Sequence, residues 1–302
     1  MHRAPRLLLA FLLGTGVITV HPAVRLMASS AAYPATAGQN QKATLKPAAA
    51  TSPDIPFRDY EFQVEQDMFE LANAARQQAG VPALTLDSGL ARAARAHALA
   101  MLDARQLSHQ FAGEPALPQR LANTSNLQLE QAGENVALDY DAQHGHEHLM
   151  LSPPHRANLL NPAYNVIGLG VVRSGDQLFI VQDFGHALPS YSPEEVKDRI
   201  AAALMQARHS AGRSELSQRE LPSADAAACS MAQADKLGTP PVQKLAKQFT
   251  VLTYTSLRPE ILPNDATHAI TSHNLRNFSV GACYARTASY PTGVYWILLS
   301  LD

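Results

Sequence analysis

The sequence has no excess of charge of either sign. Its 302 residues include 24 Lys and Arg against 26 Asp and Glu, and the charged runs are short and mixed. Proteins that bind nucleic acid or an anionic membrane surface usually present a basic patch. The balance therefore argues against both kinds of partner. At 46% hydrophobic residues the chain can form one large core or two modest ones, and we expect two units.

Cysteine is almost absent. The sequence contains only Cys229 and Cys283, and both lie in its C-terminal third. An exported chain with two cysteines can pair them, and closing this loop would stabilise the fold by about 4 kcal/mol in the chain-entropy model. Two free buried thiols are the alternative. Neither cysteine has an adjacent base, so neither is predicted to be catalytic.

A long apolar run is also missing. The apolar stretch Leu7–Val20 is shorter than the roughly 20 residues that cross a bilayer, and two glycines interrupt it. Two arginines precede this stretch and small residues follow it, which is typical of a secretory signal peptide. We therefore predict a signal peptide over residues 1–29, a secreted or periplasmic protein, and no transmembrane helix in the mature chain. An uncleaved anchor is the alternative.

Residues 30–56 are rich in Ala, Ser, Thr and Pro and contain almost no large apolar side chains. Such a composition cannot form a packed core and predicts a flexible linker. We expect the folded protein to start near Phe57.

Regular helix and strand patterns follow. The segment 60–80 has apolar residues at helical spacing, with Gly80 ending the helix, and a second, alanine-rich helix is expected from Asp87 or Ser88. A shorter helix should end at Met150. The runs "NVIGLGVVR" and "QLFIVQDFG", with turn residues between them, predict a β-hairpin. Together they predict a sheet covered by helices.

Three polar residues at the ends of these elements are candidates for chemistry. His109 lies in "QLSHQF", Glu134 in "AGENVA" and His155 in "SPPHRAN". Two imidazoles and a carboxylate suit zinc or another divalent ion. By spacing alone this signal is weak, because no pair among them has the i, i+4 separation by which one helix presents two ligands. A surface or capping role is the alternative for each.

The order of the motifs is more specific. The blocks "LANAAR", "AARAHALAM", "LSH", "GENVA", "LSPPHRANLLNPAYNVIGLGV" and "LFIVQDFG" follow one another over residues 60–186. This succession resembles the CAP superfamily, also called the SCP-like domain, in its bacterial extracellular form. The resemblance implies an α+β fold, a three-layer α/β/α sandwich over residues 57–190, with a cleft lined by two His and two acidic residues. The matching cleft positions are His109, Glu134 and His155.

The proline pair before the second histidine gives this cleft its geometry. Pro153 and Pro154 should stop the preceding helix near Leu151 and turn the chain so that His155 points into the cleft. The family's fourth, acidic position falls at Ser152, so one anionic ligand is missing and the expected metal affinity is lower.

A second histidine cluster lies just upstream. The segment "QHGHEHL" places His144, His146 and His148 at alternate positions, which could chelate a transition ion if the segment were extended. A solvated, mobile stretch at the start of a helix is the preferred interpretation.

The remaining residues, 191–302, repeat the pattern of the first unit. The stretch from Val196 can be laid over the first two helices, so that Arg208 matches Arg76, Gly212 matches Gly80 and Leu216 matches Leu84. A later hairpin pattern also recurs. We interpret this half as a smaller, degenerate CAP-like α+β unit that lacks the "GEN" block and a counterpart of His109. Coincidence between two alanine-rich patterns is the alternative.

Two classes of function are compatible with these residues. The first is an exported binding module, with a divalent ion such as zinc in the cleft and a protein, lipid or cell-envelope ligand elsewhere. The second is a metal-dependent peptidase or esterase in which His109 and His155 hold the ion and Glu134 is the general base. A serine-type variant would use Ser152 as nucleophile beside His155. Because one fold carries many functions, we rank binding first.

Overall fold

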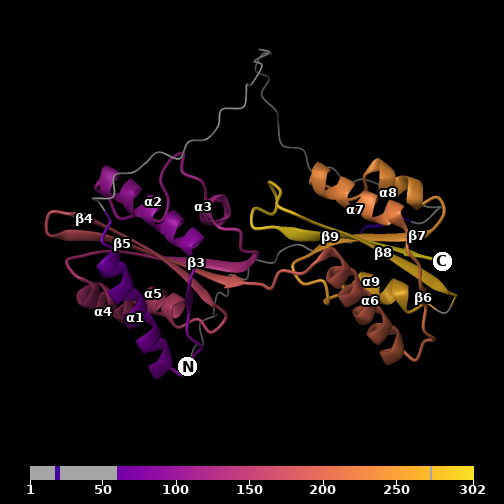
Figure 1. Ribbon diagram of the computed structural model, residues 1–302, viewed down its shortest axis with the longest axis horizontal. Helices are drawn as coiled ribbons and strands as arrows, with labels where there is room; N and C mark the ends of the chain where they lie inside the picture. Colours follow the sequence, from indigo (N-terminus) through magenta and orange to yellow (C-terminus); the bar gives the residue numbers. More distant parts are fainter. Residues whose placement is uncertain (1–17, 21–59, 273) are drawn as a thin grey trace, which may run out of the picture.

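The computed structural model describes residues 18–20, 60–272 and 274–302, which form two units (Figure 1). The predicted linker, 30–56, and most of the predicted signal peptide lie outside these residues. One strand, β1 (Ile18–Val20), falls inside the predicted signal peptide and pairs antiparallel with a strand of the second unit. The predicted signal peptide and the predicted start of the folded protein near Phe57 stay predictions.

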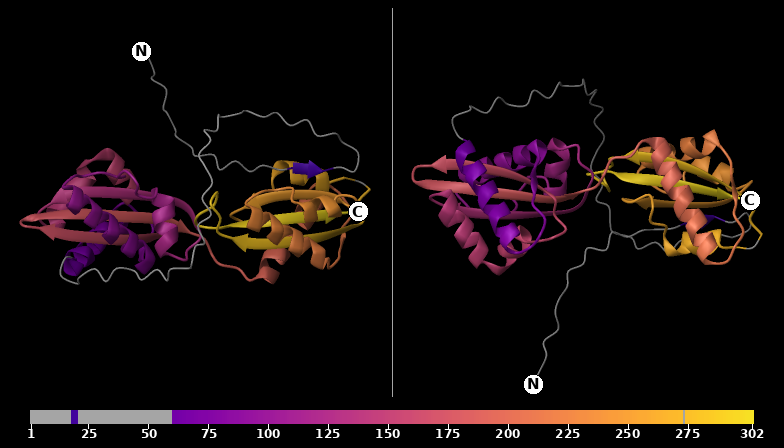
Figure 2. Two further views of the ribbon diagram at one scale, coloured as in Figure 1. Left: turned by 90° about the horizontal axis from the view of Figure 1, so that it is seen from above. Right: turned by 60° about the horizontal axis from the view of Figure 1, so that its bottom comes forward.

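The first unit contains five helices and four strands. In chain order they are α1 (Phe62–Gln78), β2 (Thr85–Leu86), α2 (Ser88–Ala104), α3 (Leu117–Thr124), β3 (Leu129–Asp139), α4 (Ala142–Leu151), α5 (Pro153–Leu159), β4 (Val166–Ser174) and β5 (Gln177–Ala187). The sheet order is β2-β4-β5-β3, parallel only at β2. Helices α2 and α3 cover one face and α1, α4 and α5 the other (Figures 1 and 2). The predicted three-layer α/β/α sandwich is confirmed.

The second unit has the same order of elements, except that one helix, α9, stands in the place of α4 and α5. It consists of α6 (Pro193–Ser210), β6 (Ser217–Gln218), α7 (Pro222–Ala234), α8 (Pro240–Leu245), β7 (Thr250–Ser256), α9 (Asn264–Ile270), β8 (Asn277–Ala285) and β9 (Val294–Leu301). Its sheet order is β1-β7-β9-β8-β6, so β6, β8, β9 and β7 follow the order of β2, β4, β5 and β3. Helices α7 and α8 cover one face, and α6 and α9 cover the other (Figure 1).

Local sequence explains the helix ends near the candidate cleft. Asp87 caps α2 by accepting a hydrogen bond from the Leu90 amide, which decides between the two predicted caps. Helix α4 ends at Leu151, as the proline pair predicts. Pro153 and Pro154 then occupy the first turn of α5, where a missing amide hydrogen costs nothing. The turn is therefore a junction between two helices, and His155 lies in the first turn of the second one.

Close approach between α2 and the sheet depends on glycine. A Cβ at Gly168 or Gly170 of β4 would lie 2.1 or 2.2 Å from the α2 backbone at Leu90 and Ala94. The two positions accept no side chain, and the alanines of α2 allow the same contact from the helix side. This close packing holds the loop after α2, which carries His109, near the sheet.

The predicted correspondence between Arg76 and Arg208 is reproduced in detail. Arg76 is fully buried and donates from Nε to the Pro82 carbonyl and from its Nη atoms to three carbonyls around α5, those of Leu159, Asn161 and Tyr164. Arg208 donates from Nε to the Ser214 carbonyl, again six residues ahead, and from Nη1 to Ile270 and Ser272. Each guanidinium thus ties its first helix to the segment before the sheet's central hairpin.

The same correspondence extends to the two segments after these arginines. Gly80 and Gly212 both have left-handed φ values, +70° and +65°. Leu84 and Leu216 are both buried.

A disulfide joins Cys229 of α7 to Cys283 of β8. It links the helix layer of the second unit to its sheet, across a sequence separation of 54 residues. Among the residues described, no helix combines the length and the apolar character needed to cross a bilayer.

Candidate functional site

The candidate cleft of the first unit brings His109 and Glu134 together. His109, in the loop after α2, has its Nδ1 2.9 Å from Glu134 Oε1, which projects from β3. The Glu134 side chain is only 4% exposed, whereas that of His109 is 58% exposed. The hydrogen bond to Glu134 raises the pKa of His109 above its usual 6.5, against an opposing effect of burial. The imidazole is thereby oriented with its second nitrogen toward solvent.

The second oxygen of Glu134 is held by an arginine that the sequence analysis missed. Arg120, on α3, donates from Nη2 to Glu134 Oε2 and from Nη1 to the His109 carbonyl, and its side chain is 6% exposed. A buried carboxylate needs such a partner to remain charged. Nothing in the pattern around Arg120 marked it, because it follows Pro115 and Pro118 in a segment for which no helix or strand was predicted.

A buried histidine and a second carboxylate complete this charge network. His97 is fully buried on α2, with Nε2 2.8 Å from the Ser108 carbonyl and Nδ1 2.7 Å from Glu114 Oε1. Burial alone would raise the pKa of Glu114, but hydrogen bonds from His97 and the Phe111 amide and the charge of Arg120 hold it below 4.5. The network fixes the His109 loop against α2 and α3.

Asp183 adds an unusual carboxyl group. It lies on β5 directly opposite Glu134 and is completely buried. Burial, and then the negative charge of Glu134, raise the pKa of Asp183 well above 3.8. The lone Asp in the apolar strand pattern "LFIVQDFG" is the signal that could have identified it.

His155 is positioned by a ladder of amides. Asn135 of β3 donates to the His155 carbonyl at 3.1 Å, and Asn158 donates to Asn135 Oδ1 at 2.9 Å and to the Glu134 carbonyl. Burial, followed by the positive charge of His109, lowers the pKa of His155 below 6.5. The two cleft histidines therefore lie close enough to repel one another when protonated, with His155 partly exposed.

These contacts decide what the cleft can hold. Within the described part of the chain, no group of three or more His, Cys, Asp or Glu side chains is arranged to hold a metal ion. Glu134 is engaged by Arg120 and His109, and the guanidinium would repel a divalent ion next to it. A three-ligand site therefore does not fit these residues, and two imidazoles remain.

Ser152 does not lie where a nucleophile beside His155 would lie, and the "QHGHEHL" segment is not extended as a chelate of alternate histidines would require. Ser152 is the residue between α4 and α5, and no hydrogen bond joins its hydroxyl to His155 in the described structure. The segment forms the body of α4 instead of a mobile start, because the preceding Asp141 caps the helix. His146 is buried there, so the three histidines do not share a face.

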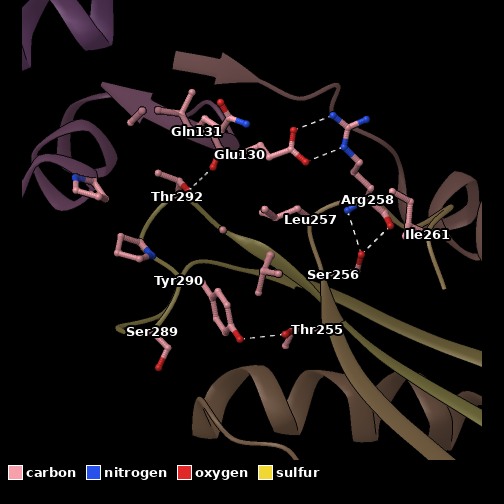
Figure 3. Close-up of a pocket in the computed structure, with 16 residues that line it drawn as sticks. Glu130, Gln131, Thr255, Ser256, Leu257, Arg258, Ile261, Ser289, Tyr290 and Thr292 are labelled. Atoms are coloured by element: carbon pink, nitrogen blue, oxygen red, sulfur yellow. Dashed lines mark hydrogen bonds and ion pairs between the residues drawn. The ribbon is translucent and has the colours of Figure 1, made fainter. Parts of the chain in front are cut away.

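A separate cavity of about 420 Å³ lies where the two units meet (Figure 3). Its walls come from the start of β3, the end of β7 and the turn before β9. Arg258 spans the boundary with a two-fold hydrogen bond to Glu130, at 2.8 and 2.7 Å, and Thr292 donates to the Leu129 carbonyl. Apolar walls with a few fixed polar groups, at a boundary between units, are typical of small-molecule sites. None of the cleft residues lines this cavity.

Comparison with known proteins places the first unit in a family. The model of the cysteine-rich secretory protein family, CAP, matches residues 69–184. The uncharacterized protein YkwD of Bacillus subtilis is 32% identical over 161 residues, which is 52% of this chain and 60% of that protein. The chain thus spans less than two thirds of that relative.

Two solved structures are similar to part of this chain. An extracellular protein containing an SCP domain from Bacillus anthracis is 31% identical, with a TM-score of 0.37 and coverage of 41% of each chain. A cysteine-rich secretory protein from Staphylococcus aureus is 22% identical, with a TM-score of 0.34 and coverage of 44% of this chain and 41% of the other. The family match and the motif order cover the same region, so the first unit contains a CAP domain.

Proposed function

We propose that this protein is an exported CAP-domain binding module and not a hydrolase. The observation that carries the proposal is the engagement of both Glu134 oxygens, one by Arg120 and one by His109, in a side chain that is almost completely buried. A general base must lie within hydrogen-bond reach of the water or substrate proton that it removes, and the burial of Glu134 keeps its carboxylate away from solvent. Glu134 instead holds the imidazole of His109 in place.

The cleft pair is proposed to take a divalent ion weakly. His109 donates from Nδ1 to Glu134, which leaves Nε2 for an ion, in the arrangement by which a carboxylate orients a metal-binding imidazole. His155 would be the second ligand and water would complete the shell. Glu134 thus changes from the predicted ligand to the residue that orients one.

Export is supported by the N-terminal sequence and by the disulfide. A basic start followed by an apolar stretch is typical of a signal peptide, and disulfides persist mainly in oxidising compartments. We propose residues 57–190 and 191–302 as the two domains of the exported chain, with a protein, lipid or cell-envelope ligand as partner.

The test combines binding with catalysis. Zn²⁺ is titrated calorimetrically into the full chain carrying His144→Ala and His148→Ala, with and without His109→Ala and His155→Ala. We expect one weak site that the cleft substitutions remove, because the cleft offers only two imidazoles. Mixed peptide and ester substrates should not be hydrolysed in the presence of Zn²⁺. Hydrolysis that is lost in Glu134→Gln would overturn the binding proposal.

A further inference from the structure

Helix α4 carries a histidine pair that the cleft does not use. His144 and His148 are four residues apart in a helix, so their side chains lie on one face about 6 Å apart at Cβ. Both are open to solvent, with 44% and 62% of the side chain exposed. His146, between them, is buried on the other side of the helix. An extended segment would have placed all three alternate histidines on one side. The helix instead brings only His144 and His148 together, at i and i+4.

Each of these imidazoles is oriented by a carboxylate. His144 Nδ1 lies 2.9 Å from Oδ2 of Asp141, the cap of α4, and His148 Nδ1 lies 2.6 Å from Oδ2 of Asp139, at the end of β3. An ionised carboxylate only accepts hydrogen bonds, so Nδ1 carries the proton in each neutral ring. The lone pair is left on Nε2 in both rings. Metal-binding histidines have this second contact in most known sites.

The surroundings favour a cation. The carboxylates of Asp141 and Asp139 that orient the two imidazoles give this face of α4 negative charge. The ring of Tyr140 lies 4.3 Å from that of His144, centroid to centroid, and limits its rotation. Negative charge near the pair raises the local concentration of cations. The cleft differs, because a guanidinium occupies the corresponding place beside its carboxylate.

We propose that His144 and His148 bind a divalent transition-metal ion through their Nε2 atoms. Imidazole is a good ligand for Zn²⁺, Cu²⁺ and Ni²⁺ but not for Mg²⁺ or Ca²⁺, which prefer oxygen. Two protein ligands leave coordination positions open, so water or a donor from outside the chain completes the shell. The site is on the outer surface of the first unit and does not depend on the proposed ion in the cleft.

The test separates this site from the cleft. Cu²⁺ and Zn²⁺ are titrated calorimetrically into the full chain carrying His109→Ala and His155→Ala, so that only sites outside the cleft contribute. We expect one ion per chain, bound more tightly when it is Cu²⁺. His144→Ala and His148→Ala should each weaken binding at least about tenfold, because loss of either ligand ends the chelation.

The matched control is His209→Ala. His209 is an exposed helical histidine with Met205 and Arg213 at the i±4 positions, so its removal should leave the affinity unchanged. Absence of binding in the cleft-deficient chain would overturn the proposal. So would equal affinity in His148→Ala, since the ion would then rest on one imidazole. Because the titrations use a chain without cleft ligands, failure of the cleft proposal would not affect the result.

Discussion

The two units share a backbone plan and differ in what fills its centre. The two central hairpins can be aligned through the short parallel strand beside each of them. Val166 pairs with Thr85 in the first unit, and Asn277 pairs with Ser217 in the second, so these two pairs are taken as equivalent. In that register the cross-strand pair Glu134 and Asp183 corresponds to Val251 and Ser300.

The helix above each sheet changes in the same way. The αL residues that follow α2 and α7 are Arg105 and Asp235, and the residue eight positions earlier is His97 in α2 but Ala227 in α7.

The comparison separates the scaffold from the site. Arg76 and Arg208 bond to backbone carbonyls, so their role survives changes of neighbouring side chains. The charge network depends on a few buried side chains, and its positions in the second unit are occupied by Ala227 and Val251, which belong to a hydrophobic cluster. We infer that the second unit is a degenerate copy in which packing has replaced the polar site.

The largest effect is expected from the shared arginines. Arg76→Ala should destabilise the first unit by about 5 kcal/mol, because four charge-assisted hydrogen bonds are lost and buried carbonyls are left unpaired. Arg208→Ala should have a similar but smaller effect on the second unit. Urea unfolding followed by circular dichroism measures both. Arg219→Ala, on the surface, is the control and should change stability little. If only one of the two substitutions lowered the free energy of unfolding, the two arginines would not have equivalent roles in the two units.

The disulfide should distinguish the units next. Reduction, or Cys229→Ala with Cys283→Ala, should destabilise the second unit by about 4 kcal/mol, from the loop that the bond closes. The only tryptophan, Trp296, is buried in β9 and reports on this unit by fluorescence. The first unit contains no cysteine, so its own transition should not move. A shift of both transitions would show that the units unfold together.

Placing the valine of the second unit's position 251 at position 134 tests whether apolar packing can take the place of the polar site. Glu134→Val should cost about 3 kcal/mol, because the buried Arg120 loses one of its two carboxylate partners and keeps only Glu114. Adding Arg120→Met should restore part of that loss, since an apolar pair of similar volume removes a buried charge that is no longer fully paired. Thermal unfolding of the two single variants and the double variant gives the coupling energy. Additive losses would mean that the pair does not act as a unit.

The smallest effect is a pH dependence confined to the first unit. The folded pKa of His109 is raised above 6.5, so the charge-assisted contact with Glu134 contributes its full stabilisation below that pH, and this contribution is lost as the pH rises through the raised value. Solvent exposure limits the contribution to less than about 1 kcal/mol. His109→Gln should lose stability at about pH 5.5 but not at about pH 8.5. A proton NMR titration in Glu134→Gln should show the His109 pKa falling back.

Motif order and periodicity were enough to predict the first unit. The α/β/α layers follow from the resemblance that the motif order carries, and the helix end at Leu151 follows from the proline pair. The match between Arg76 and Arg208 follows from the internal repeat. The cleft was predicted only in part, since His109 and Glu134 were expected to meet but Arg120 and Asp183 were not. These two residues come from α3 and β5, and no spacing rule relates them to the "GEN" block.

The sequence by itself determined where helices and strands form, because capping residues, prolines and apolar periodicity act over a few residues. It also determined which residue types are available for chemistry. Tertiary structure alone decided their roles. Glu134 changed from a predicted metal ligand to a buried partner of Arg120, and His144 and His148 became neighbours on one helix face. Burial and distance set the charge state and the partners of each polar group, and both depend on segments that are far apart in the chain.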